Sequence, residues 1–128
     1  MQGFTKVTYG TERQILFNVG ADVNISVGIV VSDADVTANA DGKKIVKAGT
    51  PLAGDLIERT TAFTAATTVS NVSDAVGVLL HDVDVTGGSN NGTLLIDGFV
   101  DLNKVDADVL AKITADVKTA LVHVRFLK

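Results

Sequence analysis

The sequence predicts a small, mainly β domain with one short α-helix near its C-terminal end and an extended N-terminal arm. Apolar residues make up 46% of the 128 residues and are mostly aliphatic, while aromatic residues account for only 5%. Valine and threonine are abundant, and their branched side chains pack well on a pleated sheet. Short apolar stretches alternate with turn signals about every 8–12 residues, a spacing typical of a small sandwich or barrel.

The first 22 residues are predicted to form an N-terminal arm ahead of a single β-rich domain over residues 23–128. They show no sustained period, and Gly3, Gly10 and Gly20 interrupt them. Such a terminus is poorly ordered, forms a first strand, or becomes ordered by adding a strand to a partner. The partner interpretation is favoured because half of the phenylalanine and tyrosine residues lie here. The candidate partner-binding anchors are Phe4, Val7, Tyr9, Ile15 and Phe17.

The domain itself is predicted to consist of strands joined by glycine-containing turns. Strands are expected over residues 23–31, 45–46, 56–57, 75–85, 93–100 and 120–127, with turns or loops at 39–42, 47–55 and 87–92. Asp41-Gly42 is a hairpin signal, and Gly98 inside a strand indicates a bulge or a close backbone approach. The Thr- and Ala-rich residues 60–73 are interpreted as a surface excursion without an assigned element.

One helix is predicted over residues 104–115. Asn103 can cap it, and Asp106 and Asp108 fall in its first turn, where the helix dipole favours negative charge. An apolar face at helical spacing supports the assignment and comprises Val109, Leu110 and Ile113.

Composition narrows the possible functions. Cysteine is absent from the sequence, which excludes a disulfide framework, a thiolate nucleophile and cysteine-bound metal. The net charge is −4 and the basic residues are scattered, so nucleic acid is not an expected partner. No stretch approaches the roughly 20 apolar residues of a membrane span, and the N-terminus lacks a secretory signal pattern. Synthesis in the cytoplasm is therefore expected.

The sequence predicts no catalytic, cofactor or metal site. His81 lies beside Asp82 and Asp84, but in a strand neighbouring side chains point to opposite faces. Asp82 and Asp84 are therefore interpreted as a solvated acidic pair, and His123 as an outward-facing residue. The glycine-rich stretch 87–92 precedes an expected strand, whereas a phosphate-binding loop precedes a helix. The expectation is a protein that binds other proteins and is not an enzyme.

Several short sequence motifs resemble, in their order along the chain, those of the head decoration proteins of tailed bacteriophages. These are the capsid cement proteins of lambda type, and the motifs also resemble those of the related phage head fibre proteins. The motifs are Val46–Leu52 (VKAGTPL), Asp74–Leu80 (DAVGVLL), Asp97–Leu102 (DGFVDL) and the closing stretch Ala120–Phe126. The resemblance covers about residues 44–128 and rests on the order and spacing of short motifs.

The resemblance implies a β-rich domain that forms a homotrimer and docks on the exterior of the capsid at local three-fold positions. The partner would be the major capsid protein, whose subunits the trimer would bridge, and the protein would reside in the virion. The family also has an N-terminal segment that pairs with a strand of the major capsid protein, and residues 1–22 lie where that segment would lie. Deleting them is accordingly expected to abolish capsid binding while leaving the domain folded.

Two other functions remain open at this point. One is a different virion role, as a head fibre base, a tail module or an adhesin domain. The other is a small hydrolase or carbohydrate-binding domain, although ligand pockets usually combine polar with aromatic groups and this chain has few aromatic residues.

Overall fold

The computed structural model describes Ile15 and residues 24–128, and its mainly β architecture confirms the predicted fold class. The strands are β1 (Ile25–Val31), β2 (Ile45–Val46), β3 (Pro51–Ala53), β4 (Thr64–Ala65), β5 (Thr68–Val69), β6 (Val72–Ser73), β7 (Gly77–Leu79), β8 (Val83–Asp84), β9 (Asn90–Asp101) and β10 (Val124–Leu127). The helical segments are the 3-10 turn η2 (Leu102–Lys104) and the helices α1 (Ala107–Leu110) and α2 (Ala115–Ala120).

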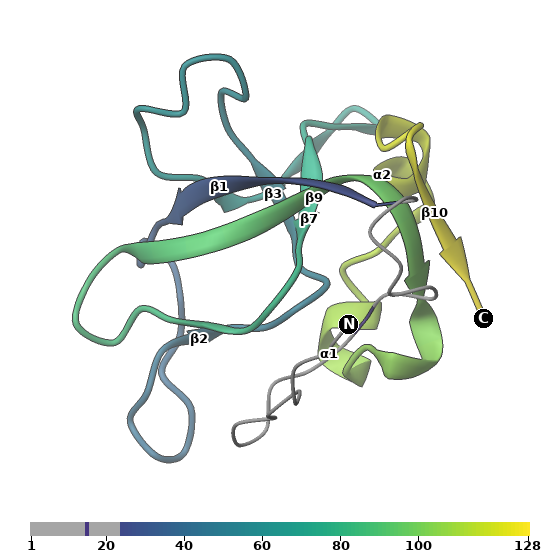
Figure 1. The fold of residues 1–128 in the computed structure, drawn as a ribbon. Coiled ribbons are helices and arrows are strands. Elements are labelled where there is room, and N and C mark those ends of the chain that lie inside the picture. Colours follow the sequence, from purple (N-terminus) through teal and green to yellow (C-terminus); the bar gives the residue numbers. More distant parts are fainter. Residues whose placement is uncertain (1–14, 16–23) are drawn as a thin grey trace, which may run out of the picture.

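The largest sheet is built around the long strand β9. Its strand order is β1-β9-β7-β3-β4, and β10 pairs in parallel with the C-terminal half of β9 (Figure 1). Phe63, just before β4, forms a bridge to Val31: its N–H donates to the Val30 carbonyl at 2.8 Å, and its carbonyl accepts from Ser32 N–H at 2.9 Å. The last strand of the sheet thereby returns to β1, which closes the sheet into a small irregular barrel.

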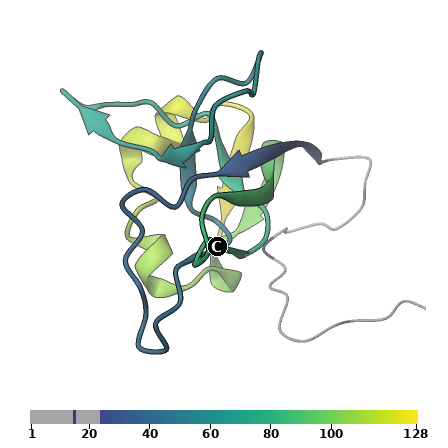
Figure 2. The ribbon, with the colours of Figure 1, turned by 90° about the vertical axis from the view of Figure 1, so that its left-hand side faces the viewer.

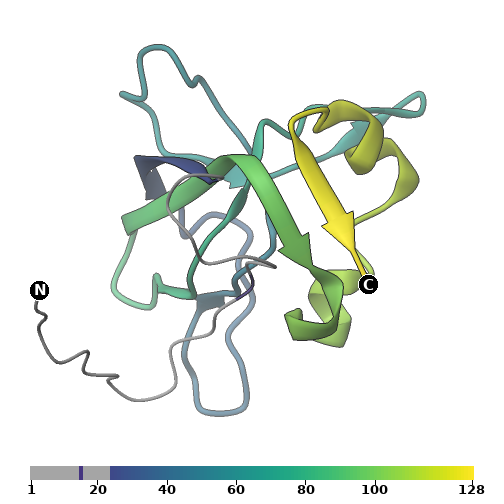
Figure 3. The same ribbon diagram turned by 45° about the vertical axis from the view of Figure 1, so that its right-hand side comes forward.

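The helical segments and β10 cover one side of this barrel. Figure 2, which looks at the molecule from the β1 side, places α1 and α2 behind the sheet. Figure 3 shows β10 beside the end of β9, with both strands running in the same direction. Among the described residues no helix is long and apolar enough to cross a membrane.

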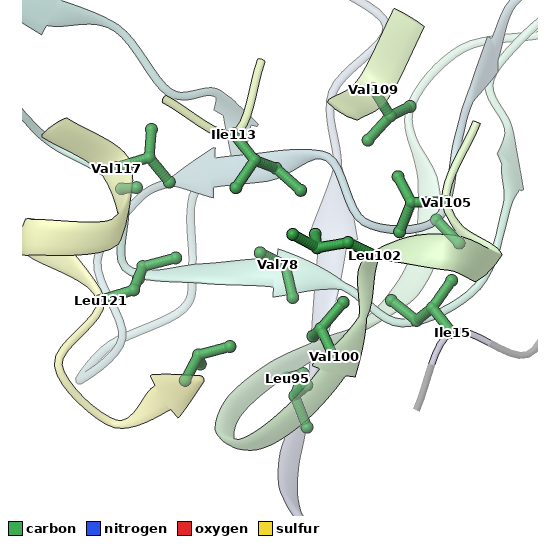
Figure 4. Packing of buried hydrophobic residues seen from close by; sticks show 13 residues of the cluster. Ile15, Val78, Leu95, Val100, Leu102, Val105, Val109, Ile113, Val117 and Leu121 are labelled. Atoms are coloured by element: carbon green, nitrogen blue, oxygen red, sulfur yellow. The ribbon is translucent and has the colours of Figure 1, made fainter. Parts of the chain in front are cut away.

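Two hydrophobic cores lie on opposite faces of β7 and β9. Leu94 and Leu79 belong to the core inside the barrel, whereas Leu95 and Val78 belong to the core under the helices (Figure 4). Adjacent residues of a strand point to opposite faces, so a strand that is buried on both faces needs a continuous apolar run. This requirement explains the apolar stretches at residues 75–80 and 94–96.

The single predicted helix is wrong, because two helices occupy the region. Thr114 interrupts it: its hydroxyl accepts a hydrogen bond from Val117 N–H at 3.3 Å and caps α2. Asn103 lies inside η2, where Asp101 provides the cap by accepting from Asn103 N–H at 2.9 Å. The apolar residues still recur every four positions and all face one core, namely Val109, Ile113, Val117 and Leu121. The four-residue spacing of the buried apolar residues therefore continues through Thr114, although the helix itself is interrupted there.

The predicted strand over residues 75–85 is also broken. β7 ends at Leu79, and β8 pairs with β2 in a separate two-stranded sheet. Between them the Asp82 carboxylate accepts a hydrogen bond from Ala48 N–H at 2.7 Å, so a side chain supplies the acceptor where the chain leaves the sheet. The last strand begins at Val124 rather than Ala120, because Ala120 ends α2.

Several loops differ from expectation as well. Residues 47–55 contain β3, with the buried Pro51 at its first position, where a missing N–H is tolerated. Residues 56–57 belong to a turn, and the unassigned residues 60–73 contain β4 and the β5–β6 hairpin.

The predicted turn at Gly42 is confirmed, and Gly42 has a φ angle of +76° there. Gly98 is closely approached by a side chain rather than by backbone, because an added Cβ would lie 2.5 Å from the Asn24 Oδ1 atom.

Gly77 is expected to tolerate no side chain. A Cβ there would lie 2.7 Å from both the Leu94 Cγ atom and the Leu95 carbonyl oxygen, and the pairing of Leu95 with Val78 prevents that backbone from moving. We expect Gly77→Ala to lower the free energy of unfolding by about 1–3 kcal/mol, measured by urea denaturation. Gly28→Ala is the matched control in β1, because its Cβ would meet nothing within 4 Å. Equal unfolding midpoints for the two variants would contradict the packing described for Gly77.

Candidate docking site

The predicted partner-binding anchors fall mostly outside the described part of the chain. Phe4, Val7, Tyr9 and Phe17 are not among the described residues, so their assignment stays a prediction. Ile15 is described, and the structure places it inside the protein.

Ile15 is a core residue and not a free anchor, which corrects its predicted role. Its side chain is 0% exposed and lies beside Val100, Leu102 and Val105 (Figure 4). Its carbonyl accepts a hydrogen bond from Asp101 N–H at 2.8 Å. The physical reason is that β9 extends beyond its pairing with Ile25, so the edge at Asp101 and the apolar side chains of η2 are available to a further segment.

Ile15 lies within residues 1–22, the predicted arm, and its side chain packs in the core of the domain. The packed unit includes Ile15, ahead of the predicted boundary at residue 23. The part of the N-terminal segment that lies beyond this attachment point is residues 1–14, which contain Phe4, Val7 and Tyr9.

Asp82 and Asp84 accept hydrogen bonds within the domain, and His123 lies in a turn. Asp84 is exposed and accepts hydrogen bonds from the hydroxyl and the N–H of Thr86, and these bonds lower the pKa of the Asp84 carboxyl. Asp82 is exposed like Asp84, as expected for residues that face solvent, and one of its carboxylate oxygens also accepts a hydrogen bond from Ala48 N–H. His123 is exposed in the turn before β10, as expected, and its carbonyl accepts from Gly98 N–H. Within the described residues no three His, Asp or Glu side chains could hold a metal ion together.

An ion-pair network that the sequence did not predict connects Lys47 to the start of α1. The Lys47 Nζ atom lies 3.0 Å from Asp108 Oδ2 and 3.2 Å from Asp106 Oδ2. The hydrogen bond to Asp108, followed by that to Asp106, raises the pKa of Lys47, and the bond from Lys47 lowers the pKa of Asp108. The sequence predicts that the two acidic residues interact with the helix dipole, but it does not predict their contact with Lys47, because 61 positions separate Lys47 from Asp108.

Lys47→Met is expected to lower the free energy of unfolding by about 0.2–1 kcal/mol, because the network is partly exposed. The lowered pKa of Asp108 means that its contribution is present above its ordinary value of 3.8 and is lost as the pH falls through the folded-state pKa. The raised pKa of Lys47 means that its contribution is present below 10.5 and is lost above it.

Urea unfolding of wild type and Lys47→Met should therefore differ between about pH 5 and pH 9 and converge in acid. Lys118→Met, which removes an exposed lysine from α2, is the control for the change in net charge. A difference between wild type and Lys47→Met that persists undiminished at pH 2 would contradict the ion-pair explanation.

A cavity of about 310 Å³ lies beside this network, between the loop after β1, the strands β2 and β3, and α1. Its lining combines aliphatic side chains such as Val36 and Leu52 with the hydroxyl groups of Ser32 and Thr50 and the lysine Lys112. No histidine is among its lining residues. Two further lining residues are the aspartates Asp35 and Asp108, so the charged groups of the cavity balance and the cavity favours neither sign of charge.

Comparison with known proteins adds no relative: no family model matches the sequence, and no curated protein matches it significantly.

Proposed function

We propose that this protein is a virion structural protein that binds the outer surface of a phage capsid and stabilises it by bridging subunits of the major capsid protein. The observation that carries the proposal is the spatial arrangement of the sequence motifs that resemble the decoration family. These motifs are far apart in the sequence, yet they supply adjoining strands of one sheet.

The first motif, residues 46–52, contains most of β3. The second, residues 74–80, contains β7, and the third, residues 97–102, contains the end of β9. Pro51 pairs with Val78, and Val78 pairs in turn with Leu95 of β9. Gly49 N–H donates to the Leu79 carbonyl at 2.7 Å, and the closing stretch adds β10 through the pairing of Val124 with Gly98. Motifs that combine into one packed region support a shared structural unit better than isolated matches do.

The proposed mechanism is selective binding to the assembled shell. A subunit that contacts neighbouring capsid proteins binds only their assembled arrangement, and it stabilises that arrangement by mass action. The N-terminal segment would add a strand to the major capsid protein through Phe4, Val7, Tyr9 and Phe17. In a homotrimer three such segments act together, because the first contact raises the effective concentration of the others.

The test is co-sedimentation with shells assembled from the major capsid protein encoded in the same genome. The expected result is saturable binding to expanded shells, no binding to unassembled capsid protein, and a higher melting temperature of the decorated shell. Light scattering should give a trimer, either in solution or after release from the shell. Protein that stays in the supernatant at saturating concentration, or that labels tails in negative-stain micrographs, would overturn the proposal.

A further inference from the structure

Two asparagines and a glycine, Asn90-Asn91-Gly92, begin β9, and both asparagines are exposed. An asparagine side chain is modified without an enzyme when the backbone nitrogen of the next residue attacks its amide carbon. The rate of this reaction depends on how closely that nitrogen is held to the side-chain Cγ atom. The two asparagines differ in this respect.

The Asn90 side chain is held against the backbone nitrogen of Asn91. Its Oδ1 atom accepts a hydrogen bond from Asn91 N–H at 2.8 Å, and its Nδ2 atom donates to the Asp84 carbonyl at 3.1 Å. Because Cγ is bonded to both Oδ1 and Nδ2, these two hydrogen bonds fix the amide plane and keep the Asn90 Cγ atom beside the Asn91 nitrogen. A reaction between groups that are already in contact avoids the entropy of bringing them together.

The Asn91 nitrogen lies outside the ladder that joins β1 to β9. Phe63 N–H donates to the Val30 carbonyl, so the backbone groups of Val30 face away from β9, and the residue opposite Val30 is Asn91. Residues opposite each other in antiparallel strands alternate between hydrogen-bonded and non-hydrogen-bonded pairs, and Val30 with Asn91 is a pair of the second kind. The Asn91 N–H therefore bonds the Asn90 side chain instead of β1.

Asn91 is the more reactive asparagine in a flexible chain, because the glycine that follows it places no side chain beside the attacking nitrogen. In the fold Gly92 is opposite Ile29, and by the same alternation this pair is hydrogen-bonded. An added Cβ at Gly92 would lie 2.9 Å from the Cγ2 atoms of both Val31 and Val83, so Gly92 is also packed against the barrel interior. The ladder and this packing keep the Gly92 nitrogen from attacking Asn91.

We infer that Asn90 is a self-modification site of the folded protein. The Asn91 nitrogen gives its proton to solvent and bonds to the Asn90 Cγ atom. The Cγ–Nδ2 bond then breaks, and the amide nitrogen takes a proton from water and leaves as ammonia. Water opens the resulting succinimide at either of its two carbonyl carbons, which gives aspartate or isoaspartate. The inference is independent of the proposed function.

Either product changes the start of β9. The new carboxylate has no N–H to donate to the Asp84 carbonyl, and it adds a negative charge near the exposed Asp84 side chain. Isoaspartate also lengthens the backbone by a methylene group at the pair of Asn90 with Val31, where the pairing of β1 with β9 ends. Modified molecules should therefore bind an anion exchanger more tightly, and this end of the sheet should exchange its amide hydrogens faster.

The experiment incubates the full-length protein in alkaline buffer, folded in one sample and unfolded in urea in another, and maps the products by tandem mass spectrometry. In the folded protein Asn90 should be converted on the order of tenfold faster than Asn91, and in urea the order should reverse. Asn90→Gln should lose the product at this position, because its longer side chain cannot close the succinimide ring. Asn91→Gln keeps the backbone nitrogen, so the conversion of Asn90 should be unchanged. Circular dichroism confirms that both variants are folded.

The comparison of the two asparagines decides the inference. Faster conversion of Asn91 than of Asn90 in the folded protein would overturn it, and so would an Asn90 rate that does not fall when the protein is unfolded. A folded protein in which neither asparagine is converted, over a time that modifies the unfolded chain at Asn91, would overturn it as well. Loss of the residue-90 product in Asn90→Gln and its persistence in Asn91→Gln would support attack by the Asn91 backbone nitrogen.

Discussion

Deletion of residues 1–22 is expected to destabilise the domain strongly, in contrast to the expectation from the sequence that the remainder stays folded. The deletion removes Ile15, whose side chain is fully buried and whose carbonyl is bonded to Asp101 N–H. Removing a large aliphatic side chain from a core costs about 2–5 kcal/mol, a large share of the roughly 5–15 kcal/mol by which domains are stable. Urea denaturation followed by circular dichroism measures the loss.

Two matched variants separate folding from binding. Deletion of residues 1–11 removes Phe4, Val7 and Tyr9 but keeps the buried Ile15, so its unfolding midpoint should lie above that of the chain lacking residues 1–22, while shell binding should be lost. Ile15→Ala keeps the whole segment and should be destabilised like the longer deletion. If the chain lacking residues 1–22 unfolds at the same urea concentration as the full chain, Ile15 makes no net contribution to the core.

Phe63→Ala is expected to cost about 3–5 kcal/mol, the largest effect of any single substitution proposed for the barrel core. The Phe63 ring is fully buried, and it packs so closely against Gly54 that a Cβ there would lie 2.6 Å from the ring. The backbone of Phe63 also closes the barrel onto β1. Removal of the ring leaves a cavity at the point where the sheet returns to its first strand.

Phe99→Ala is the matched control, because it makes the same replacement at an exposed phenylalanine. Phe99 is 37% exposed on the outer face of β9, so its truncation should cost about 1 kcal/mol or less. Thermal unfolding of both variants against wild type provides the comparison. Similar losses for the two phenylalanines would contradict the assignment of Phe63 to the barrel core.

Local patterns in the sequence predicted those features that depend on neighbouring residues. The branched run at residues 25–31 forms a strand, Asp41-Gly42 turns the chain, and Gly98 allows the approach of Asn24. The features that were missed depend on contacts between distant parts of the chain. Asp82 ends a strand by bonding Ala48, a residue 34 positions away, and no local pattern signals that choice.

The candidate site was harder to predict than the fold for the same reason. Ile15 resembles the other apolar residues of the N-terminal segment, and only its packing against η2 distinguishes it. The β5–β6 hairpin could have been suspected from the pattern Val69-Ser70-Asn71-Val72, in which two branched residues flank a two-residue turn signal.

β9 contributes to both cores, and this affects how the protein unfolds under heat or mechanical force. Leu94 faces the interior of the barrel and Leu95 faces the helices, so detachment of β9 would expose both cores. The barrel and the helical layer are therefore expected to melt in a single cooperative transition, without a half-melted form. We therefore expect the whole domain to keep its fold up to the unfolding transition and to lose it there in one step.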